Sequence, residues 1–228
     1  EAGEFGIALS WFEKAARHAY ANGALSESES FTREALENLS RTAPSLDTKN
    51  VKIRLLILKG SILVDLYGYG NPLATAAFRE ATSLFEKGSI LTEEAFYALH
   101  GFFETLYGGT DLRELRRVSD SLLEMARDRK SADFPIVSLW TEGSTDFWEG
   151  RFGRSLDAFD RCLSLGESAE LSRDLWSENR NGVLVQARSY RLWSLWFLGR
   201  YRSAGRDLES ALNWAADPQN MKKIGHLL

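Results

Sequence analysis

The chain has 228 residues, 44% of them hydrophobic, and its 28 basic and 32 acidic residues leave a formal net charge of −4. No long run of Lys or Arg is present, which argues against a nucleic-acid-binding groove, because such a groove must displace the counterions of phosphates. The single Cys162 excludes an intrachain disulfide, and one cysteine with three scattered histidines argues against a zinc site.

The sequence also bears on the cellular location of the protein and on whether the chain is a fragment. No signal-peptide pattern opens the chain, and apolar runs such as Leu55 to Leu58 are too short to span a bilayer. With the lone cysteine, these features predict a cytoplasmic setting without membrane association. The chain opens with Glu1-Ala2-Gly3 in place of an initiator Met, so we expect a fragment of a larger protein.

The first predicted feature is a pair of helices joined at Gly23. A helix carrying Trp11 and Phe12 is expected to end there, and a second helix to begin near Ser26, which forms a capping-box pattern with Glu29. The pair follows a template: a glycine, an aromatic or leucine two residues later, a small residue three further on, and a small residue followed by Leu seven beyond that. Its members here are Gly23, Leu25, Ser28 and Ala35-Leu36.

Two looser copies of this template follow. The second copy has a helix over 48–67 and another from Pro72. Asn71 can cap this second helix, and proline at its first position loses no helical hydrogen bond. The third has a helix over 92–107 and another from about residue 111. Their template residues are Lys59-Gly60, Gly70 and Phe78 to Ala81 in the second copy, and Gly101, Gly108-Gly109 and Leu122-Leu123 in the third.

The last two copies follow the template most closely. Their helices are predicted over 133–149, 152–165, 183–198 and 201–216. Their template residues are Gly150, Phe152, Ser155 and Cys162-Leu163, then Gly199, Tyr201, Ala204 and Ala211-Leu212. Residues 166–182 interrupt the repeat, and we expect there a short helix around 169–176 and a polar loop over 178–182. A further helix is predicted from Pro218.

The repetition predicts the fold class. Glycine takes the turn between two antiparallel helices, the aromatic fills the gap at the start of the second, and small residues let the helices approach. No stretch alternates as a strand does, and five copies exceed the minimum of about three that a solenoid needs. We therefore predict an all-α, tetratricopeptide-like (TPR-like) α-α superhelix of about five helix pairs, forming a single domain over residues 1–228.

Four segments resemble a known family. They read AARHAYANGALSESESFTREAL, GYGNPLATAAFREATSLFE, ALHGFFETLYGGTDLRELRRVSDSLLEMA and FLGRYRSAGRDLESAL. They are similar to the TPR-like C-terminal region of bacterial signalling ATPases of the adenylate/guanylate cyclase-associated or transcriptional-regulator type. The resemblance implies a sensing or autoinhibitory role, in which the repeats bind an effector or partner and release the ATPase. Asn181-Gly182-Val183 stands where the family usually has a Gly-Asp-Pro-like turn, so no ligand is carried over to the 166–182 insertion.

Motifs of catalysis are absent from the sequence. It contains no GxxxxGK[ST], HExxH or GxSxG pattern. Carboxylates alternate with basic residues, as at Glu114 and Arg117, which is typical of solvated helix faces. Cys162 occupies a small-residue position of the template and is expected in the core. We therefore predict no enzymatic activity and no cofactor.

Candidate binding residues follow from the repeat. In TPR-like arrays the first helix of each pair lines the concave surface, and Trp, Tyr and Arg dominate binding hot spots. The groove candidates on first helices are Phe102, Trp140, Phe147, Trp148, Trp193 and Trp196, with Arg188 and Arg191 as a contact for anionic groups. Packing between repeats is the alternative role for each aromatic.

Three functions stay open. The first is a regulatory protein-interaction or effector-sensing domain of a signalling ATPase or transcriptional regulator, with a protein, peptide or small effector as partner. The second is a free-standing peptide-binding TPR adaptor, although Glu13 and Arg17 stand where a carboxylate clamp would hold Lys and Asn. An enzyme is the third, and it would need convergent polar groups in a pocket. The oligomeric state also stays open, since the mildly apolar 221–228 could cap the array or contact a neighbouring molecule.

Overall fold

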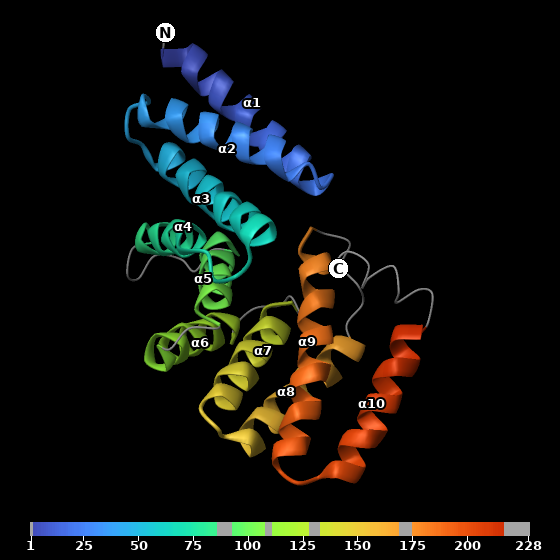
Figure 1. Cartoon of the computed structure of the whole chain (residues 1–228). Helices are drawn as coiled ribbons and strands as arrows, with labels where there is room; N and C mark the ends of the chain where they lie inside the picture. Colours follow the sequence, from blue (N-terminus) through green and yellow to red (C-terminus); the bar gives the residue numbers. More distant parts are fainter. Residues whose placement is uncertain (1, 86–92, 108–110, 128–132, 169–174, 217–228) are drawn as a thin grey trace. The chain divides into compact units, whose positions relative to one another are not determined.

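The protein folds into α-helices over the part of the chain that its computed structural model describes, residues 2–85, 93–107, 111–127, 133–168 and 175–216 (Figure 1). The helices in these ranges are α1 (Ala2–Ala21), α2 (Leu25–Ser40), α3 (Leu46–Tyr67), α4 (Pro72–Ser83), α5 (Glu93–Leu106), α6 (Leu112–Ala126), α7 (Asp133–Trp148), α8 (Phe152–Ser168), α9 (Leu175–Phe197) and α10 (Tyr201–Ala216). The predicted all-α, TPR-like fold class is confirmed. The helix predicted from Pro218 lies outside the described residues.

Two predictions of local structure are wrong. The polar loop expected over 178–182 is part of α9, which begins at Leu175. Tertiary packing outweighs the polar composition here: Val183 is buried, and Leu184 contacts α8 at Gly166. Ser26 does not cap α2, since the helix already begins at Leu25 and its first turn has no side-chain cap. Most of the short helix predicted over 169–176 lies outside the described residues.

Contacts divide the chain into two compact units, Glu1–Asp111 and Leu112–Leu228. In unit 1 each helix from α1 to α5 packs against the next, and the first helices α3 and α5 also meet. Unit 2 repeats this pattern from α6 to α10, with first helices α7 and α9 in contact. Contact of consecutive helices and of alternate helices is what a stacked α-α array requires. The third predicted pair is divided, because α5 belongs to unit 1 and α6 to unit 2.

The turns between paired helices share one conformation. Gly23, Gly150 and Gly199 have φ of 73°, 75° and 72°, a left-handed region that favours glycine. After each glycine, the next amide donates to a carbonyl five residues back: Ala24 to Ala19 at 2.9 Å, Arg151 to Asp146 at 2.8 Å and Arg200 to Leu195 at 2.9 Å. These are Schellman motifs, and they explain why the template places glycine at this position.

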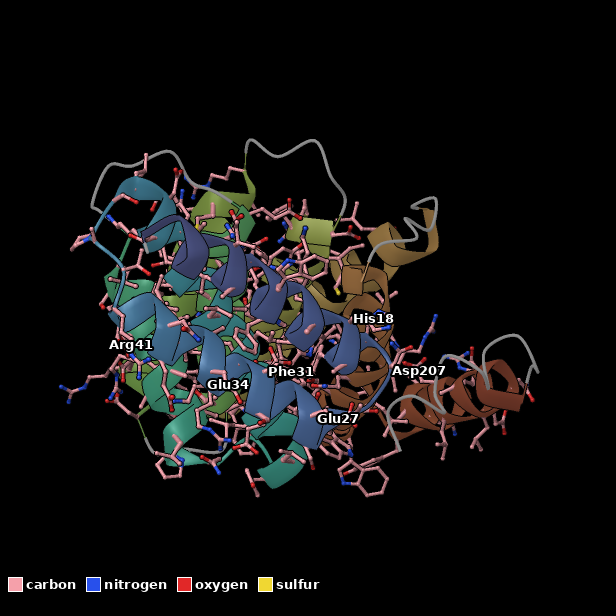
Figure 2. All side chains as sticks on the ribbon, turned by 90° about the horizontal axis from the view of Figure 1, so that it is seen from above. His18, Glu27, Phe31, Glu34, Arg41 and Asp207 are labelled. Atoms are coloured by element: carbon pink, nitrogen blue, oxygen red, sulfur yellow. The ribbon has the colours of Figure 1, made fainter. Side chains whose placement is uncertain are left out.

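The first pair illustrates how the helices then pack. Figure 2 shows α1 and α2 side by side, with Glu27, Phe31 and Glu34 marking the course of α2. The Phe31 ring lies 6.5 Å from that of Phe12, centroid to centroid. The template serine, Ser28, is buried and donates its hydroxyl to the backbone carbonyl of Ala16 at 2.8 Å, so a small side chain holds the two backbones close.

Second helices share a further pattern, in which a central residue is flanked by small residues four before and three after it. Its buried members are Ser28, Thr32 and Ala35 in α2, Ala74, Phe78 and Ala81 in α4, and Ser155, Phe159 and Cys162 in α8. The Phe78 ring lies so close to Gly60 of α3 and Gly101 of α5 that a Cβ at either glycine would overlap it. Phe159 contacts Gly143 of α7 in the same way.

The starts of α4 and α3 and the burial of Cys162 can also be compared with the sequence predictions. Asn71 caps α4 as predicted, its Oδ1 accepting from the amides of Leu73 at 2.8 Å and Ala74 at 3.3 Å. Ser45 and Thr48 form a reciprocal capping box at the start of α3, which went unpredicted because Thr replaces the usual Glu. Cys162 is in the core as predicted, and burial raises the pKa of its thiol to about 12.

Candidate binding site

Five aromatic side chains of unit 2 gather around a sixth, Phe147, near the C-terminal end of α7. Ring centroids lie 5.8 Å from Phe147 for Trp148, 5.4 Å for Phe152, 5.0 Å for Tyr190, 6.1 Å for Trp193 and 5.7 Å for Phe197. These six residues are called the aromatic cluster below. Most of the pairs are edge-to-face, the arrangement that the ring quadrupole favours, and the rings of Phe152 and Phe197 stack at 4.7 Å.

The cluster has a buried base and an exposed rim. Phe147 is buried, whereas Trp148 is 46% exposed, Trp193 47% and Phe197 60%. Trp196 precedes Phe197 in the sequence and is exposed, and its ring lies 4.8 Å from that of Tyr201 at the start of α10. Large aromatic surface left in water beside a packed base is a feature of binding surfaces.

A network of charged groups stands next to this cluster. The carboxylate of Asp146, on α7, is 1% exposed. Arg116 of α6 donates to it at 2.5 Å and Arg151 at 3.0 Å, while the Nε of Arg154 lies 3.6 Å away. Glu149 pairs with the same Arg116 and Arg151. The network fixes the end of α7 against α6 and α8, and so fixes the base of the aromatic cluster.

Arg191, predicted to contact an anionic group of a ligand, forms ion pairs within the protein. Its Nε donates to Asp160 of α8 at 2.5 Å, and its guanidinium also pairs with Asp207 of α10. The side chain therefore links α8, α9 and α10. Arg188 lies half-buried one turn earlier on α9.

Two of the predicted groove aromatics are core residues. Phe102 belongs to unit 1, is buried, and has the Arg79 guanidinium 5.3 Å from its ring centroid. Trp140 is only 1% exposed within unit 2. Neither side chain offers surface to a ligand. Both therefore have the packing role that the sequence left as the alternative. Of the six predicted aromatics, Phe147, Trp148 and Trp193 come together, whereas Trp196 contacts Tyr201.

Sequence reasoning missed part of the cluster. Tyr190 and Phe197 lie three residues before and four after Trp193, so a helical-face count from Trp193 would have found both. Phe152 was identified as a template residue that fills a turn, and its contact with Phe197 of the next copy has no local signal.

Unit 1 contains a different polar cluster, on first helices and the turn after α3. The Tyr20 hydroxyl of α1 donates to Asp65 of α3 at 2.8 Å, and His100 lies 4.0 Å from Glu104 one turn along α5. Burial lowers the pKa of His100 to about 4, so this imidazole is neutral at pH 7. Burial, and secondly the charge of Asp65, raises the pKa of Glu104 to about 8. Burial also raises the pKa of Asp65, and of Tyr69 to about 12.

Neither a metal site nor a membrane-spanning helix is present among the residues that the structure describes. No group of three or more His, Cys, Asp or Glu side chains in these ranges is arranged to hold a metal ion. None of the helices seen there combines the length and the apolar character needed to cross a bilayer.

Comparison with known proteins supports the fold. No protein-family profile matches the chain, and no curated protein matches its sequence. Among solved structures, it is similar to a Rap protein in complex with the competence and sporulation factor, with a TM-score of 0.69 and 13% sequence identity. The similarity covers 95% of this chain and 57% of the Rap chain, so the protein spans little more than half of its neighbour's length. This likeness establishes a TPR-like helical-repeat fold.

Proposed function

We propose that the chain is a regulatory protein-interaction domain that binds a protein or peptide partner through the aromatic cluster of α7 and α9. The observation that carries this proposal is the exposure of Trp148, Trp193 and Phe197 around a buried Phe147, all on first helices or adjoining turns of a TPR-like array. Aromatic side chains bury a large area with few rotatable bonds, so they contribute strongly to binding. The Rap neighbour was solved with the competence and sporulation factor bound, which supports an interaction role for this fold.

The resemblance to signalling ATPases supplies the wider context of the proposal. In this context the repeats are a cytoplasmic sensing element in signal transduction or transcription regulation, and partner or effector binding releases an ATPase domain of the same protein. The full-length protein tests this part, since partner addition is expected to raise its rate of ATP hydrolysis several-fold. The same addition should leave the rate of a Trp193→Ala, Trp196→Ala variant unchanged.

The binding surface is tested by site-specific photocross-linking. A benzophenone amino acid replaces Trp193 in one protein and Trp11 in a matched control, because Trp11 is a similarly exposed tryptophan on α1 of unit 1. Each protein is irradiated in a lysate of the source organism, and cross-linked proteins are identified by mass spectrometry. We expect a partner at position 193 that is absent at position 11.

Affinity measurements with that partner complete the test. The Trp193→Ala, Trp196→Ala variant is expected to bind it at least tenfold more weakly, with a circular dichroism spectrum equal to that of the wild type. Unchanged affinity of a folded double variant, or the same cross-linked proteins at positions 193 and 11, would remove the aromatic cluster as the binding site.

A free-standing peptide-binding adaptor is the alternative. Its carboxylate-clamp version finds no support in unit 1, because Glu13 already accepts from Arg54 of α3 at 2.6 and 3.0 Å and lies 3.7 Å from Arg17. These side chains tie α1 to α3. An adaptor would bind its peptide without any change in ATP hydrolysis, which separates it from the regulatory domain.

A further inference from the structure

The two turns beside the aromatic cluster carry an excess of positive charge. Residues 146–154 and 196–202 include four arginines, at 151, 154, 200 and 202, and two acids, Asp146 and Glu149. Stacking of Phe152 on Phe197 at 4.7 Å brings the α7–α8 turn and the end of α9 together on one edge of unit 2. This edge is basic, although the chain as a whole carries a net charge of −4.

The acids of this edge lie beneath its arginines. Asp146 is 1% exposed and Glu149 20%, whereas the Arg151 side chain is 42% exposed and that of Arg154 65%. Arg200 and Arg202 are exposed at the start of α10. A guanidinium has five N–H donors, so an arginine that contacts a buried carboxylate on one side still presents donors to the solvent.

Exposed rings and exposed arginine side chains therefore lie on or next to the same two turns. Trp148 and Phe197 offer apolar area, and Arg151, Arg154 and Arg200 stand beside them in the sequence. Carboxylates pair with guanidinium groups through charge-assisted hydrogen bonds, and apolar side chains pack on the exposed rings. A partner that carries both carboxylates and apolar side chains matches this edge.

We propose that this arginine-rimmed aromatic edge binds an acidic protein segment that carries both carboxylates and large apolar side chains. The inference rests on the proposed function and specifies the chemistry of its partner. A single-stranded nucleic acid also combines negative charge with flat rings, but it follows a groove in which basic residues track its backbone. Here the excess arginines stand at one edge of an acidic chain, which favours a protein segment.

Fluorescence anisotropy with synthetic probes tests the inference on the whole chain. The first probe is a labelled twelve-residue peptide that alternates Asp with Leu and Trp. The second has every Asp replaced by Asn, and the third is a single-stranded dT12. We expect the Asp peptide to bind at least tenfold more tightly than the Asn peptide at low salt, and this ratio to shrink as ionic strength rises.

Two matched double variants test which arginines attract the acidic peptide. Arg154→Gln with Arg200→Gln removes two arginines of the edge, and Arg161→Gln with Arg206→Gln removes two exposed arginines farther along α8 and α10. The edge variant should bind the Asp peptide about tenfold more weakly and the Asn peptide as the wild type does. The control variant should bind both peptides as the wild type does.

The outcomes separate this inference from the proposed function. If Trp193→Ala, Trp196→Ala weakens binding of both peptides while the edge variant weakens neither, the aromatic site stands and the acidic preference is overturned. Equal loss in the edge and control variants, binding of neither peptide, or tighter binding of dT12 than of the Asp peptide would also overturn it. The cross-linked partner from the lysate is unaffected by these results, so the proposed function is judged independently.

Discussion

Units 1 and 2 both place carboxylates between their helices, but they surround them differently. In unit 2, Asp146 is held by guanidinium groups from α6, from α8 and from the turn between α7 and α8. In unit 1, Asp65 and Glu104 face the Tyr20 hydroxyl and a neutral His100. The first arrangement keeps an anion in place through ion pairs, whereas the second favours a protonated acid at neutral pH.

Both units pack a phenylalanine ring of a second helix against glycine, Phe78 on Gly60 and Gly101 in unit 1 and Phe159 on Gly143 in unit 2. Unit 1 places glycines of two helices against the Phe78 ring, so it leaves little room for an added side chain on either side. Around the α7–α8 turn, unit 2 relies on the Arg116–Asp146 pair. Unit 2 should therefore be the more sensitive to loss of a charge, and unit 1 to added volume and to pH.

The largest effect is expected from Asp146→Ala. Removing this carboxylate takes the 2.5 Å partner from the part-buried Arg116 while Glu149 still pairs with it, so we expect a loss of about 3 kcal/mol of unfolding free energy, the lower end for a broken buried ion pair. Urea denaturation followed by circular dichroism measures the loss. Asp160→Ala on α8 is the control, because its 49% exposed side chain should contribute less than about 1 kcal/mol. Equal losses for both variants would show that the Asp146 network is not what holds α6, α7 and α8 together.

Gly101→Ala should have the next largest effect. Its new Cβ would overlap the Phe78 ring, and overpacking of this kind costs about 1–3 kcal/mol. Gly70→Ala is the matched control in unit 1, since a Cβ there meets no atom within 4 Å. Adding Phe78→Leu to Gly101→Ala should recover part of the loss in urea denaturation. A double variant no more stable than Gly101→Ala alone would contradict the packing explanation.

The pH dependence of unit 1 should be smaller but distinctive. The pKa of Glu104 is raised from 4.5 to about 8 on folding, so its contribution to stability is complete below pH 4.5 and is lost as pH rises through about 8. The pKa of His100 is lowered from 6.5 to about 4, so its contribution is lost only as pH falls through that range. Between pH 6.5 and 8.5 the wild type should lose about 1–2 kcal/mol of unfolding free energy.

Two substitutions on α5 isolate this effect. Glu104→Gln should flatten the profile between pH 6.5 and 8.5, because the neutral amide cannot ionise. Glu93→Gln changes an exposed carboxylate of the same helix and should keep the slope of the wild type. A slope that survives Glu104→Gln would assign the pH dependence to other groups.

The smallest effect concerns the turns, where the two units are alike. Gly150→Ala places a side chain at φ 75° and should cost about 1–2 kcal/mol. Gly153→Ala, three residues later on α8, meets nothing within 4 Å and should be neutral or slightly stabilising. Because Gly23 of unit 1 has nearly the same φ, Gly23→Ala should cost as much as Gly150→Ala in thermal unfolding. A clear difference between these two costs would show that the shared turn is not equally strained in both units.

The features that could be predicted from the amino-acid sequence alone are local. Helix ends at Gly23, Gly150 and Gly199, the Asn71 cap and the small-residue positions of second helices follow from steric limits and hydrogen bonds within a few residues. Repetition of these signals was enough to predict the all-α, TPR-like fold. The single-domain organisation over 1–228 stays a prediction, as do the groove and its partner.

Which side chains are buried against other helices became clear only from the tertiary structure. Trp140 and Trp193 are both aromatic residues of first helices, yet one is 1% exposed and the other 47%. Asp146 meets Arg116 from 30 residues away, a pairing that no local pattern encodes. Helix propensity and capping act over a turn or two, whereas burial depends on every helix packed against a residue, so the site could be narrowed only once the helices were placed.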